Sequence, residues 1–324
     1  MNLKSIVLSI LGIFYALFSG FSQVVTADPE FPTANDAVTV YFDASMGNQA
    51  LKDFTEDIYA HTGVITNESS GPSNWKYVIA AWDENTSKAK LTKVSTNLYQ
   101  LEITPSIKDF YGVAEDEEIL QMAFVFRNTD GSKVGREEDG GDIFYEVYPA
   151  GLNISITSPS QDYIIIPGDN IHIIASSNES DSMFLYIDDV LISEYQGTSI
   201  NYTYTENIAG SHKVKVIAKN TNDTKSDSVY YFARGDNQIS EKPIGWIKGI
   251  NYLSTDSAGL LLFAPNKDYV FVIGDFTEWR LMDKFQMNQT PDGEYFWLAI
   301  GDLIPGKEYI FQYYIDGELK IADP

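Results

Sequence analysis

The chain has 324 residues, of which 44% are hydrophobic and 14% aromatic, so it has enough apolar surface to form two or three globular domains. Its 46 acidic and 22 basic residues give a formal net charge of −24, which repels phosphate backbones and anionic lipid headgroups and argues against nucleic acid as a partner. Without cysteine there is no disulfide or thiolate metal site, and the histidines at 61, 172 and 212 lack metal-ligand spacing, so we expect no cofactor.

The first 27 residues have the three regions of a secretory signal peptide. Lys4 precedes an apolar run over residues 6–18, and small residues follow at 19–22. The run is shorter than the ~20 residues of a spanning helix. We expect export to the cell surface or medium, cleavage between Ser19 and Ala27, and no membrane span.

Residues 28–149 predict a first β-sandwich. Alternating apolar and polar residues at 37–44 are typical of a half-buried strand. The same signal recurs at 57–65, 75–82, 98–104, 120–127 and 143–148. A short helix is expected at 104–111, with Thr104 as its cap and Pro105 in its first turn.

Within this unit, the segment from Tyr59 to Thr66, a polar loop, W-K-Y-V from Trp75 and then Trp82 resemble starch-binding-type modules similar to families 25 and 26. In such sites a sugar's C–H face packs on an exposed ring while nearby polar groups bind its hydroxyls. The resemblance implies a carbohydrate-binding platform formed by Tyr59, Trp75, Tyr77 and Trp82, with His61 as a polar partner. If residues 75–82 form a strand, Trp75 and Tyr77 share a face and one of them can instead be core.

Residues 150–236 predict an immunoglobulin-like sandwich without its disulfide. Strands are expected at 152–155, 170–176, 182–187, 201–205, 210–220 and 226–232, with Asp188 and Asp189 forming a turn. The segments P-G-D-N-I from Pro167 and L-Y-I-D-D from Leu185 resemble Ig-like spacers of secreted polysaccharide enzymes. Residues 235–242 are expected to be a polar linker.

Residues 243–324 predict a third sandwich, with strands at 259–264, 269–273, 293–300 and 308–315. Six segments, F-A-P-N from Phe263, V-x-G-D-F-x-x-W ending at Trp279, D-G-E-Y-F-W, P-G-x-x-Y-x-F, I-D-G and A-D-P, resemble the family 48 carbohydrate-binding module. That module precedes the catalytic barrel in α-amylase-family enzymes of glycoside hydrolase family 13. The resemblance implies a catalytic domain C-terminal to Pro324 as a partner.

The family's sugar platform is matched here at one of three positions. Trp279 stands at the first tryptophan, but Gln312 and Leu319 replace the lysine and the second tryptophan. Trp279 is therefore a candidate contact in a module whose docking role is the stronger expectation. Trp297, inside a strand, is expected in the core.

No catalytic signature is present. The chain lacks the G-x-S-x-G, Walker, G-x-G-x-x-G and H-E-x-x-H motifs. Its acidic residues are spread over many loops, so the sequence does not indicate which two could form the catalytic carboxylate pair of a glycoside hydrolase. The sequence thus predicts an all-β chain of three consecutive sandwiches, without a catalytic site, that binds α-glucan (starch or glycogen) for an α-amylase-family hydrolase. The alternatives are a glycan-capture or adhesion protein with no attached enzyme, and three spacers without ligands.

Overall fold

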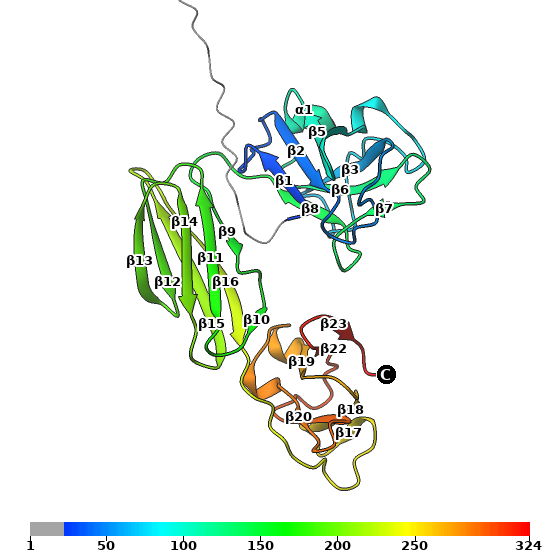
Figure 1. The fold of residues 1–324 in the computed structure, drawn as a ribbon, viewed down its shortest axis with the longest axis vertical. Helices are drawn as coiled ribbons and strands as arrows, with labels where there is room; N and C mark the ends of the chain where they lie inside the picture. Colours follow the sequence, from blue (N-terminus) through cyan, green and yellow to red (C-terminus); the bar gives the residue numbers. More distant parts are fainter. Residues whose placement is uncertain (1–22) are drawn as a thin grey trace, which may run out of the picture.

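The computed structural model describes residues 23–324, and most of the predicted signal peptide lies outside these residues. The described chain is almost entirely strand, with one short α-helix, and it folds into six sheets of mainly antiparallel strands (Figure 1). The all-β prediction is confirmed. The predicted domain boundaries stay a prediction, and the units below are named only by the sheets that share a buried core.

The N-terminal sandwich (residues 24–149) packs two sheets against each other. The first sheet has the order β1-β2-β5-β4 and the second β3-β6-β7, with β8 also pairing β6. Their bounds are β1 Val25–Asp28, β2 Val38–Asp43, β3 Ile58–Thr66, β4 Thr92–Ser95, β5 Leu98–Ile103, β6 Ile119–Asn128, β7 Val134–Gly135 and β8 Ile143–Glu146. Strand β1 overlaps the end of the predicted leader at residues 25–27, and Val24 and Val25 join the core, so a cleavage that keeps these residues occurs before Val24.

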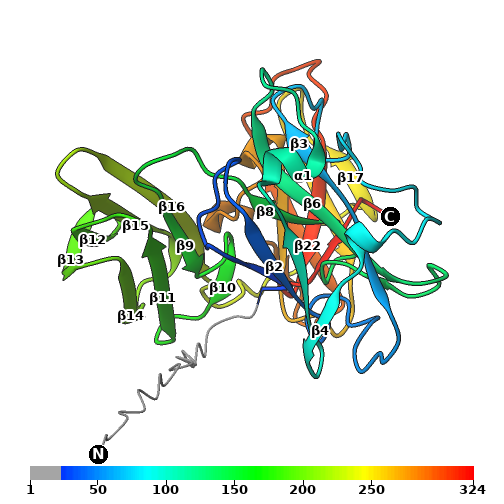
Figure 2. The ribbon, with the colours of Figure 1, turned by 90° about the horizontal axis from the view of Figure 1, so that it is seen from above.

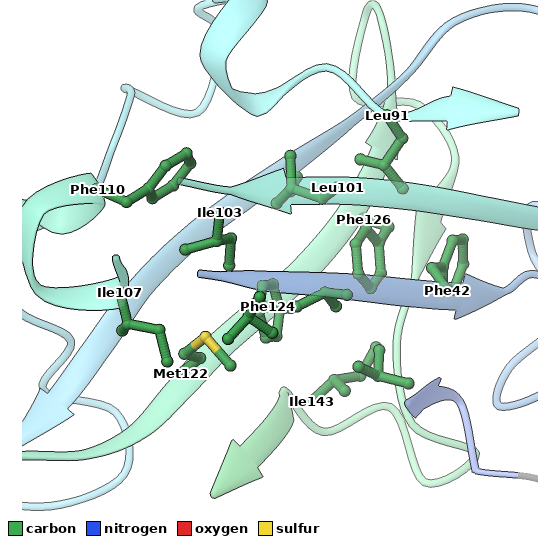
Figure 3. Packing of buried hydrophobic residues seen from close by; sticks show 14 of the residues in the cluster. Phe42, Leu91, Leu101, Ile103, Ile107, Phe110, Met122, Phe124, Phe126 and Ile143 are labelled. Carbon is green, nitrogen blue, oxygen red and sulfur yellow. The ribbon is translucent and has the colours of Figure 1, made fainter. Parts of the chain in front are cut away.

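The core of this sandwich is aromatic and aliphatic (Figure 3). Alternate residues of β2 point inward, as its sequence pattern predicts, and the Phe42 ring stacks on Phe126 with centroids 4.0 Å apart. Helix α1 (Ile107–Tyr111) closes one end and buries Ile107 and Phe110. Its cap is Ser106, which accepts a hydrogen bond from the Asp109 amide, so the predicted cap at Thr104 is wrong by two residues.

The middle sandwich (residues 150–236) pairs a five-stranded sheet, β10-β16-β15-β12-β13, with a three-stranded sheet, β14-β11-β9. Its strands are β9 Ile154–Ser158, β10 Tyr163–Ile165, β11 Asn170–Ser177, β12 Ser182–Ile187, β13 Val190–Gln196, β14 Ser199–Thr205, β15 Gly210–Lys219 and β16 Thr224–Ala233. Asp188 and Asp189 form the predicted turn with φ of 48° and 63°, a backbone conformation that Asp tolerates.

The C-terminal sandwich (residues 237–324) pairs β17-β18-β21-β20 with β19-β22-β23. Its strands are β17 Gly249–Tyr252, β18 Ala258–Phe263, β19 Val270–Gly274, β20 Asn288–Gln289, β21 Tyr295–Ile300, β22 Phe311–Ile315 and β23 Leu319–Ile321. In β21, Phe296 and Leu298 point inward. Trp297 therefore lies on the outer face, where it meets Trp246 edge to face, and its predicted core position is wrong.

The segment predicted as a polar linker, residues 235–242, is hydrogen-bonded to the C-terminal sandwich. The Ser240 amide donates to the Gln289 carbonyl at 3.0 Å, and Trp297 Nε1 donates to the Ser240 carbonyl at 3.1 Å. Asn237 is held through Gln286 and Gln289. These bonds leave little freedom between the middle and C-terminal sandwiches.

A small apolar cluster joins those two sandwiches. Phe232 of β16 meets Phe271 of β19 edge to face at 5.0 Å, and Ile273 and Leu281 complete the buried contact. The Arg280 guanidinium lies 3.7 Å from the centre of the Tyr230 ring. In both views the middle sandwich lies to one side of the other two, so the chain bends into an arc (Figures 1 and 2).

Candidate functional site

The loop at residues 67–91 runs along the free edge of β3, and hydrogen bonds fix its course. Val64 and Lys76 exchange backbone bonds, and the Ile79 amide donates to the Thr62 carbonyl at 3.0 Å. Gly63 makes this approach possible, because a Cβ there would lie 2.8 Å from the Lys76 carbonyl oxygen. Residues 75–82 were predicted as a strand, but they form only one isolated bridge.

This loop brings two tryptophans against the outer face of β3. The Trp75 ring is stacked on the His61 ring, with centroids 5.7 Å apart and planes 26° apart. Trp82 contacts the same His61 ring edge to face, with ring centroids 5.2 Å apart and an angle of 71° between the planes. Phe144 of β8 contacts Trp75 edge to face. Together with Tyr59, these residues form what we call the aromatic patch.

Trp82 is the open ring of the patch, with 40% of its surface exposed. Its indole lies against Gly131, where a Cβ would be 3.1 Å from Nε1. Trp75 is half-buried, and its Nε1 donates to the Pro72 carbonyl at 3.0 Å. Both indoles are thus held by their surroundings rather than free to rotate.

Arg127 of β6 lies beneath the patch and is 2% exposed. Its guanidinium lies between Tyr59 and Trp82, at 5.7 and 5.8 Å from the ring centres. It donates to Asn85 Oδ1 and to the Glu84 carbonyl at 2.8 Å each, and to the Asn128 carbonyl at 3.1 Å. The buried cation thus bonds both to the loop that carries Trp82 and to the end of β6, so it ties that loop to the sheet.

His61 is the centre of the patch, and its surroundings favour the neutral ring. Burial lowers its pKa from the ordinary value of 6.5, and the nearby Arg127 charge lowers it further, with Asp142 acting in the opposite direction. Its buried Nδ1 has no hydrogen-bond partner within residues 23–324. In this structure the contacts of the ring with both indoles are its main feature.

The structure separates Tyr77 from the other predicted residues. Its backbone has φ of 51°, so the alternation assumed for a strand does not hold, and its ring packs against the core of the N-terminal sandwich. Its hydroxyl donates to Glu117 Oε1 at 3.0 Å. Trp75 and Tyr77 consequently point to different sides of the sheet.

Trp279 lies on another unit, the C-terminal sandwich, and is 41% exposed. Its Nε1 donates to Asp275 Oδ1 at 3.2 Å. The six predicted contacts thus fall in three places: Tyr59, His61, Trp75 and Trp82 come together, Tyr77 is turned inward and Trp279 stands apart. Sequence reasoning missed Phe144 and Arg127. Arg127 is the antiparallel partner of Tyr59, but that register is set by the tertiary pairing of β3 and β6.

No cluster of metal-ligating side chains was found in the part of the chain that the structure describes. Across residues 23–324, no helix has the length and apolar character needed to cross a bilayer.

A family model described as a domain of unknown function (DUF8578) matches residues 25–134, which include Tyr59, His61, Trp75, Trp82 and Arg127. No curated protein matches the chain.

Several solved structures are similar to it at low identity. Fibronectin(III)-like modules of Clostridium thermocellum CbhA share 17% identity over 25% of this chain and 96% of theirs, with a TM-score of 0.22. Bacteroides uniformis beta-glucuronidase 3 shares 8% identity over 59% of this chain and 28% of that chain, with a TM-score of 0.26. A marsupial T cell receptor shares 12% identity over 92% of this chain and 98% of that chain, with a TM-score of 0.22. TM-scores this low carry no argument about ligand or activity.

Proposed function

We propose that this chain is a non-catalytic carbohydrate-binding region that holds an α-glucan chain on the aromatic patch. The observation that carries the proposal is the pair of indoles, half-buried Trp75 and 40%-exposed Trp82, which both contact His61 on the outer face of β3. Accessible, immobilised rings suit the C–H faces of sugars. The net charge of −24 does not oppose a neutral polysaccharide.

The orientation of the rings supports a curved glucan over a flat one. Trp75 is nearly parallel to His61, whereas Trp82 is steeply inclined to it, so the two indoles do not form one plane. The flat face of an extended β-linked chain needs coplanar rings. A helical α-glucan presents successive sugar faces at changing angles and matches an inclined pair.

Isothermal titration of the full chain with maltoheptaose tests this assignment. We expect Trp82→Ala and Trp75→Ala each to weaken binding about tenfold, equivalent to about 1.4 kcal/mol, which is the scale of one lost ring contact. Tyr252→Ala is the matched control, because it removes an exposed ring from the C-terminal sandwich. Unchanged affinity in both tryptophan variants would reject the patch as the site.

We further propose that this region serves an exported α-amylase-family hydrolase, because its N-terminus resembles a signal peptide and its last 80 residues resemble the module that precedes the barrel. Trp279 would then add a second, weaker contact. A continuous reading frame that encodes a barrel after codon 324 is the expected result. A stop codon there would favour a stand-alone glycan-capture protein.

A further inference from the structure

An open pocket of about 320 Å³ lies at the contact between the middle and C-terminal sandwiches, away from the aromatic patch. This volume is at the lower end of the range for small-molecule sites, about 300–1,000 Å³. One wall is the segment that leads into β10, with Asp162, and the other carries Tyr269, Tyr314 and Glu318. Sites at such boundaries between units are common.

The pocket is fixed from both sides. The Phe232–Phe271 contact and the Arg280–Tyr230 pair lock the two sandwiches together. The Arg234 guanidinium lies 4.5 Å from the centre of the Tyr269 ring. The walls are therefore held in place without a ligand, which lowers the entropy that a ligand must offset.

Asp162 carries a carboxylate at this boundary. Its backbone has φ of 60°, its amide donates to the Tyr230 carbonyl, and Gln161 Nε2 donates to Asp162 Oδ1 at 2.9 Å. Partial burial raises the pKa of this carboxyl, against the effects of Gln161, Lys320 and Arg280. A desolvated carboxylate in a pocket is a candidate hydrogen-bond acceptor for a ligand.

The charges around the pocket are balanced. Its carboxylates are Asp162, Asp316 and Glu318. Lys267 Nζ lies 3.2 Å from Asp316 Oδ2, and Lys320 and Arg280 act on Asp162. Because Asp162 and Asp316 both have basic neighbours, a cationic ligand gains little from them. A lining of carboxylates together with Tyr269 and Tyr314 suits a neutral ligand rich in hydroxyl groups.

We propose that this pocket is a second binding site, which takes one or two units of a neutral sugar between the middle and C-terminal sandwiches. Asp162 and Glu318 accept hydrogen bonds from sugar hydroxyls, and Tyr269 and Tyr314 line the rest of the site, where Arg234 and Lys320 lie over one face of each ring. The site contains no residue of the aromatic patch, so its existence does not depend on the function proposed for that patch.

Titration of the full chain carrying Trp75→Ala, Trp82→Ala and Trp279→Ala tests the site in isolation, because all three proposed tryptophan contacts are then absent. The probes are maltose, cellobiose and lactose, with putrescine and Ca²⁺ as cationic rivals. We expect at least one disaccharide to bind with a millimolar or lower dissociation constant. Adding Asp162→Asn should weaken it at least fivefold, since Asn tolerates the same backbone conformation but replaces a charged acceptor by a neutral one.

Glu318→Gln changes an exposed side chain on the opposite wall and should also weaken binding, which keeps the test valid if Asp162→Asn folds poorly. Glu194→Gln, on the exposed side of β13, should have no effect. The proposal is overturned if no disaccharide binds, if both pocket variants bind as well as their parent, or if only the cations bind.

Discussion

Arg127 should determine how well the aromatic patch is pre-organised, and Arg127→Met tests this. Methionine keeps apolar contact with Tyr59 and Trp82 but donates no hydrogen bond. Asn85 and Glu84 are exposed and can bond to water instead, whereas Asn128 is 8% exposed and its carbonyl loses the charged donor but keeps the Gly131 amide at 3.2 Å. The expected loss of stability is therefore that of one hydrogen bond to a charged group, about 1.5–3 kcal/mol.

The effect on binding follows from the freed loop. If about one residue of the loop must be ordered again when glucan binds, the cost is about 1–2 kcal/mol, or roughly a tenfold weaker affinity. Hydrogen exchange of residues 82–86 reports the loop, and titration with maltoheptaose reports the affinity. Arg127→Lys keeps the charge but lacks the planar fork, and we expect an intermediate result.

Wild-type exchange rates at residues 82–86 together with wild-type affinity in Arg127→Met would refute this reasoning. Loss of stability without any change in affinity would show that Arg127 serves the fold alone.

Two further predictions concern the other sandwiches. Burial by itself lowers the pKa of His212, but its bonds to the Asp188 carboxylate and the Ile208 carbonyl, with the charge of Glu206, outweigh burial and raise it above 6.5. The stability gained from the protonated ring is complete below pH 6.5 and is lost as the pH rises through the pKa in the folded state. The melting temperature of the wild type should therefore fall above neutral pH. His212→Gln should lack this pH dependence, and identical pH profiles would contradict the assignment. Gly259→Ala places a Cβ 2.3 Å from the Trp246 ring, so we expect about 1–3 kcal/mol of destabilisation in denaturant unfolding, and a value near zero would show that Trp246 moves freely.

The sequence predicts the inner strands well because burial on one face imposes alternation. Buried and half-buried residues alternate strictly along strand β2, and the sequence predicts its bounds to within one residue at each end. Strands at sheet edges carry no such signal. All four residues of β4 are exposed, and most of β13 is exposed, so neither was anticipated.

The sequence predicts several residues of the candidate site but not how they are arranged. The aromatic content of residues 75–82 points to ring contacts, and Trp75 and Trp82 do meet His61. Their arrangement depends on an irregular loop that pairs with the β3 edge, which local pattern does not encode. Trp297 was misplaced for a related reason, since its neighbours fill the core and turn it outward.

The most direct test of the central claim is affinity electrophoresis of the full chain in gels that contain soluble starch, glycogen or a β-glucan. We predict retardation by both α-glucans and none by the β-glucan, and loss of the retardation when Trp75 and Trp82 are both replaced by alanine. Equal mobility in all three gels, or retardation that survives both replacements, would contradict α-glucan binding by the aromatic patch.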